Sequence, residues 1–103
     1  MKLDRLALRN FRNYERLESS FSPGVNLIVG DNAQGKTNLL EAVFYLSTGR
    51  SFRTRREMEL IRFGSEFADL EGDVTGQARQ QSLRALLFAS RKPRQLFLNG
   101  VKK

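Results

Sequence analysis

One eight-residue segment contains the residues of this chain whose types and spacing best suit chemistry. It reads, in order, Gly30, Asp31, Asn32, Ala33, Gln34, Gly35, Lys36 and Thr37, and it matches the phosphate-loop pattern G-x-x-x-x-G-K-[ST]. Glycine at the loop ends lets the backbone approach a polyphosphate, because a Cβ atom there would clash or restrict the dihedral angles. Successive backbone N–H groups then point at the phosphates, and the following helix adds the positive end of its dipole.

Two side chains of this loop have separate expected roles. Lys36 is placed to reach the β- and γ-phosphates as a point charge, and the Thr37 hydroxyl is placed to complete the coordination of Mg²⁺. The plain alternative is a glycine-bearing strand-to-helix turn with an incidental lysine. The motif requires a buried strand before it and a helix after it, and the sequence offers both, so we predict binding of a nucleoside triphosphate with Mg²⁺.

The elements around the loop follow from hydrophobic periodicity. Residues 25–29 form a short apolar run, typical of a strand covered on both faces in a parallel sheet. From Gly35 the apolar residues take helical spacing, and Gly49 stands where such a helix would end. A short second helix is predicted over 56–63, before Gly64.

Period-two alternation predicts strands on both sides of this unit. They are expected at 2–8 and 16–21, with a turn at 10–13 between them, and then at 68–75, 82–89 and 95–98. The fold class predicted is α/β: a P-loop NTPase with N-terminal antiparallel strands, a phosphate-loop strand and helix, and an antiparallel β lobe. The dipeptide Asn99-Gly100 predicts a tight hairpin with almost no return strand, so residues 1–103 are interpreted as one truncated domain. Incomplete sheets expose apolar surface and strand edges, so we also expect self-association.

The composition excludes several kinds of chemistry. The 103 residues include no cysteine, which excludes disulfides and thiolate chemistry, and no histidine, which removes the usual general base. No apolar run reaches the ~18 residues that a membrane-spanning helix needs, and charges stand where a secretory signal would be apolar. We therefore expect a cytoplasmic chain with no membrane partner.

The net charge of +7 is unevenly distributed along the chain. Residues 64–78 contain four acidic and no basic side chains, whereas residues 79–103 contain seven basic and no acidic ones. A basic segment of this kind favours an anionic partner, with a nucleic acid as the first candidate, although solvated surface charge is the plain alternative.

Two further clusters of charged residues are candidate functional sites. Four arginines beside Phe52 are candidate DNA contacts, against the alternative of a solvated loop: Arg50, Arg53, Arg55 and Arg56. The acidic residues Asp69, Glu71 and Asp73 share one face of a predicted strand, and we interpret them as a solvated face rather than a metal site.

Four segments together resemble the RecF family of bacterial recombinational-repair ATPases, which is related to SMC-type heads and to ABC ATPases. They are LRNFRNY at 8–14, GVNLIVG at 24–30 with the loop, NLLEA at 38–42 and GRSFRT at 49–54. The resemblance implies that the nucleotide site comprises the loop together with Asn38, Arg12 and Asn13. It also implies binding to junctions of single- and double-stranded DNA, an ATP-dependent homodimer, action with RecR and RecO in recombinase loading, and a role in the SOS response.

The resemblance also implies that parts of the ATPase lie in later sequence. These are the glutamine-bearing loop, the signature motif and the acidic strand that orients water, so we expect residues 1–103 to bind ATP without hydrolysing it. Two other functions stay open from the sequence alone. One is a small-molecule P-loop kinase, which would usually begin with its phosphate-loop strand, and the other is a structural lobe without activity.

Overall fold

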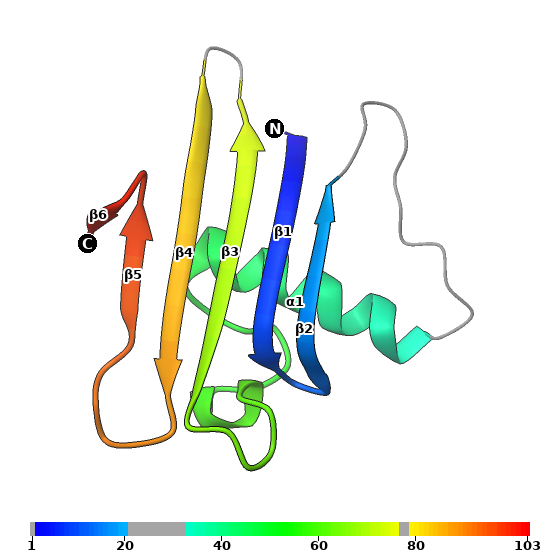
Figure 1. Ribbon diagram of the computed structural model, residues 1–103, viewed down its shortest axis with the longest axis vertical. Helices are drawn as coiled ribbons and strands as arrows, with labels where there is room; N and C mark the ends of the chain where they lie inside the picture. The colour runs from blue at the N-terminus through cyan, green and yellow to red at the C-terminus, as the bar shows by residue number, and fades with distance from the viewer. Residues whose placement is uncertain (1, 21–32, 77–78) are drawn as a thin grey trace.

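The computed structural model describes residues 2–20, 33–76 and 79–103. Its described residues form a six-stranded antiparallel sheet with one α-helix packed across it (Figure 1). The strands are β1 (Lys2–Phe11), β2 (Tyr14–Ser20), β3 (Phe67–Thr75), β4 (Gln80–Phe88), β5 (Gln95–Leu98) and β6 (Val101–Lys102), in the order β2-β1-β3-β4-β5-β6. The helix is α1 (Ala33–Thr48), and a 3-10 helix, η1 (Glu57–Leu60), precedes β3. The predicted parallel strand at 25–29 lies outside the described residues.

The two groups of antiparallel strands predicted from the sequence are one continuous sheet. Strand β1 pairs with β2 on one side and with β3 on the other, so that Leu8 stands between Leu17 and Leu70. The alternation along β3 is confirmed: Ala68, Leu70, Gly72 and Val74 are buried. The strand boundaries differ from the predicted ones by up to three residues, because pairing extends into the polar ends of β1, β2 and β4.

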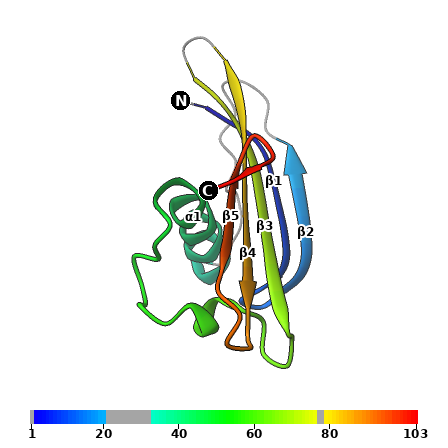
Figure 2. The same ribbon diagram turned by 90° about the vertical axis from the view of Figure 1, so that its left-hand side faces the viewer.

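Helix α1 covers one face of the sheet, and none of the described elements covers the opposite face (Figure 2). Ala42 and Tyr45 of α1 pack with buried leucines of the strands, including Leu6 and Leu87. Gly72 permits this approach, since a Cβ atom there would lie 3.1 Å from Cδ1 of Leu46. Burial of these side chains is the main source of stability, at about 25 cal/mol per Å² of apolar surface.

The predicted helix end is confirmed at Gly49, which has φ 76 and whose N–H donates to the Tyr45 carbonyl at 2.7 Å. The predicted hairpin is confirmed at Asn99 and Gly100, with φ 52 and 83, values that the mirror-image type of two-residue turn requires. The helix predicted over 56–63 is only the four-residue η1, because Ile61 is extended and pairs with Phe11.

The acidic residues of β3 lie on the uncovered face of the sheet and are ion-paired. Arg5 Nε lies 2.9 Å from Asp73 Oδ2, and Arg84 Nη2 lies 2.8 Å from Asp69 Oδ2, while both arginines also contact Glu71. The acidic face of β3, which the sequence predicts to be solvated, is therefore partly covered by the arginines that pair with it. Among the described residues, no group of acidic side chains could hold a metal ion, and no helix has the length and apolarity to cross a bilayer.

Candidate functional site

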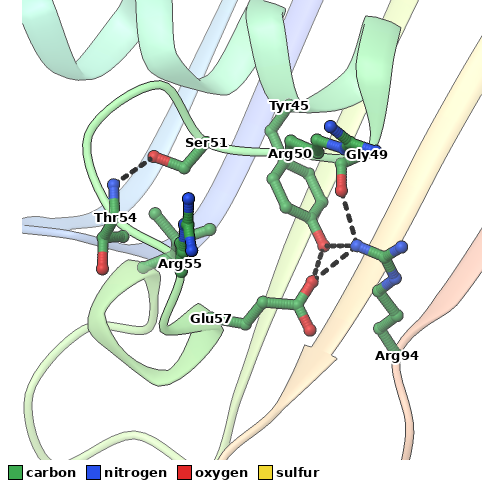
Figure 3. Close-up of a pocket in the computed structure, with 9 residues that line it drawn as sticks. Tyr45, Gly49, Arg50, Ser51, Thr54, Arg55, Glu57 and Arg94 are labelled. Atoms are coloured by element: carbon green, nitrogen blue, oxygen red, sulfur yellow. Dashed lines mark hydrogen bonds and ion pairs between the residues drawn. The ribbon is translucent and has the colours of Figure 1, made fainter.

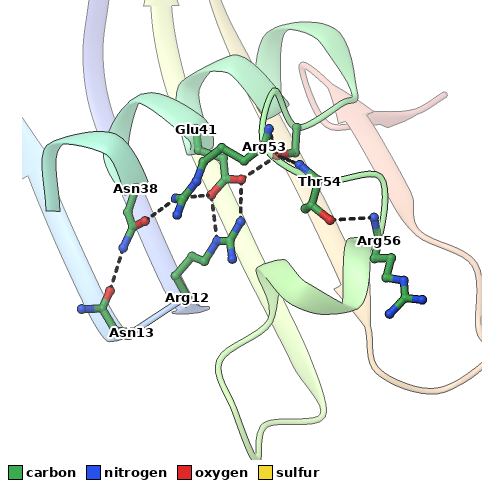
Figure 4. Close-up of polar contacts among 8 residues, drawn as sticks. Arg12, Asn13, Asn38, Glu41, Arg53, Thr54 and Arg56 are labelled. Carbon is green, nitrogen blue, oxygen red and sulfur yellow. Dashed lines mark hydrogen bonds and ion pairs between the residues drawn. The ribbon is translucent and has the colours of Figure 1, made fainter. Parts of the chain in front are cut away.

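Glu41, on α1, is the centre of a buried polar cluster (Figure 4). Its carboxylate is fully buried and accepts two hydrogen bonds of 2.8 Å from Arg12, one from Nε and one from Nη2. Ser51 Oγ donates to it at 2.6 Å, and Arg53 Nη1 donates at 3.3 Å. A buried carboxylate needs such partners, because removing it from water without them costs about 2–5 kcal/mol.

The partners of Glu41 keep it ionised. Burial alone would raise the pKa of this carboxyl group, but the hydrogen bonds from Arg12 and Ser51 and the charges of Arg12 and Arg53 outweigh burial and hold the pKa below its ordinary value of 4.5. The pKa of the Arg12 guanidinium is raised, chiefly by its hydrogen bonds to Glu41. One anion and two cations therefore meet beside α1, and Glu59 adds a second negative charge that acts on Arg12.

The backbone positions Arg12 for this contact. Arg12 has φ 53 in the turn between β1 and β2, and Asn10, near the end of β1, has φ 54. The Arg12 N–H donates to the Leu60 carbonyl at 2.8 Å, and Asn10 accepts from the N–H of Arg62 at 2.7 Å. These bonds attach the turn to η1 and to the residues after it, and the left-handed backbone turns the Arg12 side chain toward α1.

Asn38 extends the cluster toward the first turns of α1. It is 2% exposed, its Nδ2 donates to Asn13 Oδ1 at 2.9 Å, and its Oδ1 accepts from Arg53 Nη1 at 2.7 Å. Three segments of the chain thus meet in this cluster, as Figure 4 shows. The β1–β2 turn contributes Arg12 and Asn13, α1 contributes Asn38 and Glu41, and the arginine-rich segment contributes Arg53. A groove of about 900 Å³ lies beside the cluster, and part of its wall is formed by Arg12, Asn13, Asn38 and Arg53.

A second cavity, of about 580 Å³, lies at the other end of α1 (Figure 3). Arg50 and Arg55 line it, together with Ser51 and Thr54. Arg94 reaches it from the segment between β4 and β5. Its Nη1 donates to the Gly49 carbonyl at 2.5 Å, to Glu57 Oε2 at 2.8 Å and to the Tyr45 hydroxyl at 3.1 Å. Tyr45 in turn donates to Glu57, and its own burial and the Glu57 contact raise its pKa.

The structure separates the residues that the sequence analysis grouped together. The motif residues Gly30, Asp31 and Asn32 lie outside the described residues, while 33–36 form the first turn of α1, followed there by Thr37 and Asn38. All four candidate DNA-binding arginines are exposed, and the side chain of Arg53, 28% exposed, also donates to Asn38 and Glu41.

Sequence reasoning did not identify Glu41, Ser51, Tyr45, Glu57 or Arg94 as parts of these sites. For Glu41 a signal existed: Asn38 and Glu41 lie three residues apart, and Ala42 and Tyr45 continue the same helical stripe, all of them buried. Polar residues on the buried stripe of a helix require partners inside the protein. No comparable pattern indicated Arg94, which contacts residues 37 to 49 positions away along the chain.

The fold and the motif define the class of protein. A phosphate-loop motif that leads into a helix, packed on an antiparallel sheet that begins before the motif, is the arrangement of P-loop ATPase heads of the ABC and SMC type. The chain belongs to the family described as the RecF/RecN/SMC N-terminal domain, whose model matches residues 2–97. This membership argues against the small-molecule kinase alternative.

Individual relatives agree with this assignment. The chain is 51% identical over 87 residues to the DNA replication and repair protein RecF of Lacticaseibacillus casei, covering 84% of this chain and 24% of that protein. It is 45% identical over 101 residues to RecF of Halalkalibacterium halodurans, covering 98% and 27%. A solved structure described as the recombination mediator protein RecF with ATP matches with a TM-score of 0.89 and 37% identity, over 99% of this chain and 27% of that one. The chain thus spans about a quarter of the length of these relatives.

Proposed function

We propose that residues 1–103 provide the N-terminal part of the ATP-binding head of a RecF-like DNA replication and repair protein. The observation that carries the proposal is that α1 begins at Ala33, inside the phosphate-loop motif. The buried cluster around Glu41 then fixes the turn with Arg12 and Asn13 against the same helix. Similarity to RecF and to its ATP-bound structure supports the choice of ATP.

The residues of this chain fit a triphosphate with Mg²⁺. The first turn of α1 contains no acidic residue, so nothing there opposes an anion at the positive end of the helix dipole. In the proposal the backbone of 30–37 surrounds the phosphates, Lys36 binds the β- and γ-phosphates and Thr37 coordinates Mg²⁺. Bound Mg²⁺ would supply charge neutralisation between the phosphates. We expect binding without turnover, because the resemblance assigns the water-orienting carboxylate to other sequence.

Calorimetric titration of the chain with Mg·ATP tests this proposal. The wild-type chain should bind, and Lys36→Ala should weaken binding at least tenfold, since removal of one charged hydrogen-bonding partner is worth about 1.5–3 kcal/mol. Lys102→Ala removes an exposed lysine of β6 and serves as the matched control. Equal affinity of wild type and Lys36→Ala, or steady ATP hydrolysis abolished by Lys36→Ala, would contradict the proposal.

For the whole protein we propose DNA as partner, at gaps and at junctions of single and double strands, with cytoplasmic location. Arg50 and Arg55 support this, because both are exposed and line one cavity. Arg53 also donates to Asn38 and Glu41, so its role in the proposal is first to support the cluster. By resemblance to RecF, we also propose that the whole protein forms an ATP-dependent homodimer. We propose that it acts with RecR and RecO and takes part in the SOS response.

We further propose that the chain by itself associates with a second copy. Leu40, Phe44 and Phe52 are 52%, 39% and 50% exposed, and the rings of Phe44 and Phe52 lie 5.3 Å apart. Leu40 and Phe44 are one helical turn apart on α1, so the three side chains form a continuous apolar strip. Contiguous apolar surface of this kind favours association.

A further inference from the structure

Three basic side chains and two aromatic rings form a row across one end of the sheet. Arg16 of β2 is the register partner of Arg9 of β1, and Cζ of Arg9 lies 5.2 Å from the centre of the Phe67 ring on β3. Phe67 pairs with Phe88 of β4, and Nζ of Lys92, from the segment between β4 and β5, lies 4.5 Å from the centre of the Phe88 ring. These five residues are called the basic row below.

Strand alternation places the basic row on the face of the sheet that α1 does not cover (Figure 2). Leu8, Ala68 and Leu87 are direct sequence neighbours of members of the row, and all three are buried in the core on the side of α1. Successive side chains of a strand point to opposite faces of the sheet. The row is therefore on the opposite side of the sheet from α1 and from the cavity at the end of that helix.

The positive charges of the basic row are not neutralised by the chain itself. Arg9, Arg16 and Lys92 are exposed, and none of the ion pairs in the described part of the chain includes them. The carboxylate opposite Arg9, that of Asp69, accepts bonds of 3.1 and 2.8 Å from Arg84 instead. A cation is attracted to the face of an aromatic ring, so the two rings hold Arg9 and Lys92 in place.

The middle of the same face has the opposite sign of charge. Two arginines there are ion-paired with four carboxylates: Arg5 and Arg84 with Glu18, Asp69, Glu71 and Asp73. Four carboxylates against two guanidinium groups leave this area net negative. An extended anion would be attracted to the basic row and repelled by the adjacent area, so it would run across the strands and not along them.

We propose that the basic row binds the phosphodiester backbone of a nucleic acid strand, which crosses β2, β1, β3 and β4 at this end of the sheet. The row is separate from Arg50 and Arg55, so the proposal adds a second contact surface and requires neither these arginines nor bound ATP. Phosphate contacts depend on charge and position and not on base sequence, so we expect binding to strands of any sequence.

An acidic segment of another protein is the alternative partner, and the basic row suits it less well. Protein interfaces are anchored by apolar and aromatic side chains that fill pockets of the partner. Phe67 and Phe88 are only partly exposed, and one face of each ring is already occupied by a cation. The row thus offers an extended anion its charges and offers a protein segment little apolar surface.

Fluorescence anisotropy of the chain with labelled duplex and single-stranded oligonucleotides, at several salt concentrations, tests the proposal. Arg9→Ala, Arg16→Ala and Lys92→Ala should each lower the salt slope by about 0.9 on duplex DNA and about 0.7 on a single strand. Arg9→Lys keeps the charge and should keep the slope. Arg79→Ala removes an exposed arginine at the other end of β4 and is the matched control. Urea denaturation should show wild-type stability for every variant, because the altered side chains are exposed.

The possible outcomes separate this proposal from the earlier one. Unchanged slopes for all three alanine variants, with Arg50→Ala and Arg55→Ala still weakening DNA binding, overturn the basic row and leave the other surface standing. Lower slopes for the row variants alone support the row and overturn the role of Arg50 and Arg55. Absence of DNA binding by the wild-type chain overturns both. Polyglutamate binding that requires the row, beside DNA binding that does not, overturns the proposal in favour of an acidic protein partner.

Discussion

Arg12 and Glu41 form a two-bond ion pair across 29 positions of sequence, with both hydrogen bonds 2.8 Å long. The carboxylate is fully buried, whereas the side chain of Arg12 is 19% exposed. The pair attaches the β1–β2 turn to α1 close to the motif. Through Ser51 and Arg53 it also fixes the segment that leaves the helix.

Removal of Arg12 should destabilise the fold strongly. Arg12→Ala leaves the buried carboxylate of Glu41 with Ser51 and Arg53 alone, and breaking a buried pair in this way costs about 3–5 kcal/mol. Urea denaturation measures the loss. Arg16→Ala, at an exposed residue of β2, is the control and should change the free energy of unfolding by less than about 0.5 kcal/mol. A loss as small as that for Arg12→Ala would show that the pair is not formed.

The stability that Glu41 contributes should disappear in acid. Its pKa is lower in the folded chain than its ordinary 4.5, so the unfolded chain takes up the proton first as the pH falls. The contribution is therefore complete above about pH 5 and declines below the ordinary pKa. Denaturation of wild type and Glu41→Gln across this range should give a difference that shrinks with acidification. A difference independent of pH would contradict this, and Glu15→Gln, on exposed β2, controls for loss of a carboxylate.

The arginines of 50–56 should separate into two functional groups. Arg50→Ala and Arg55→Ala should each weaken binding to a gapped DNA and lower the salt slope by about one, because each removes one phosphate contact, while leaving stability unchanged. Arg53→Ala should instead reduce stability, since it removes donors to Asn38 and Glu41. Fluorescence anisotropy at several salt concentrations, with parallel denaturation, measures both. Reduced stability for Arg55→Ala with unchanged DNA affinity would reverse the assignment.

The apolar strip on α1 should mediate self-association of the chain. Phe52→Ser shortens the strip at a half-exposed residue and should shift sedimentation toward monomer at high concentration. Met58→Ser, at 64% exposure and outside the strip, is the matched control. A wild-type chain that sediments as a monomer at the same concentration would refute the proposal.

Local features of the fold were predictable because local sequence determines them. The alternation of 68–75 and the turn at Asn99 and Gly100 appear in the structure as predicted, and Gly49 ends α1. The pairing of the N-terminal strand β1 with the later strand β3 in one sheet was not predicted. It depends on pairing of Leu6 with Gly72, between segments far apart in sequence, for which periodicity contains no signal.

The helix that follows the motif was predictable, whereas most of the side-chain contacts that support it were not. The resemblance assigns Arg12 and Asn13 to the nucleotide site, and the structure shows that both contact side chains of α1, Arg12 through Glu41 and Asn13 through Asn38. Arg53 was grouped with its neighbours because composition alone does not show which way a side chain turns. Its orientation is set by Asn38 and Glu41, which the sequence presents as ordinary helix residues.

The place of β1 between β2 and β3 has a consequence for synthesis on the ribosome. The strand made first must wait for β3, since its second neighbour begins only at Phe67. Until then the described strands of the nascent chain can form only the hairpin of β1 and β2, and two-stranded hairpins are at best marginally stable by themselves. Emergence of β3 from the exit tunnel should therefore be the step at which this part of the chain first becomes resistant to proteases.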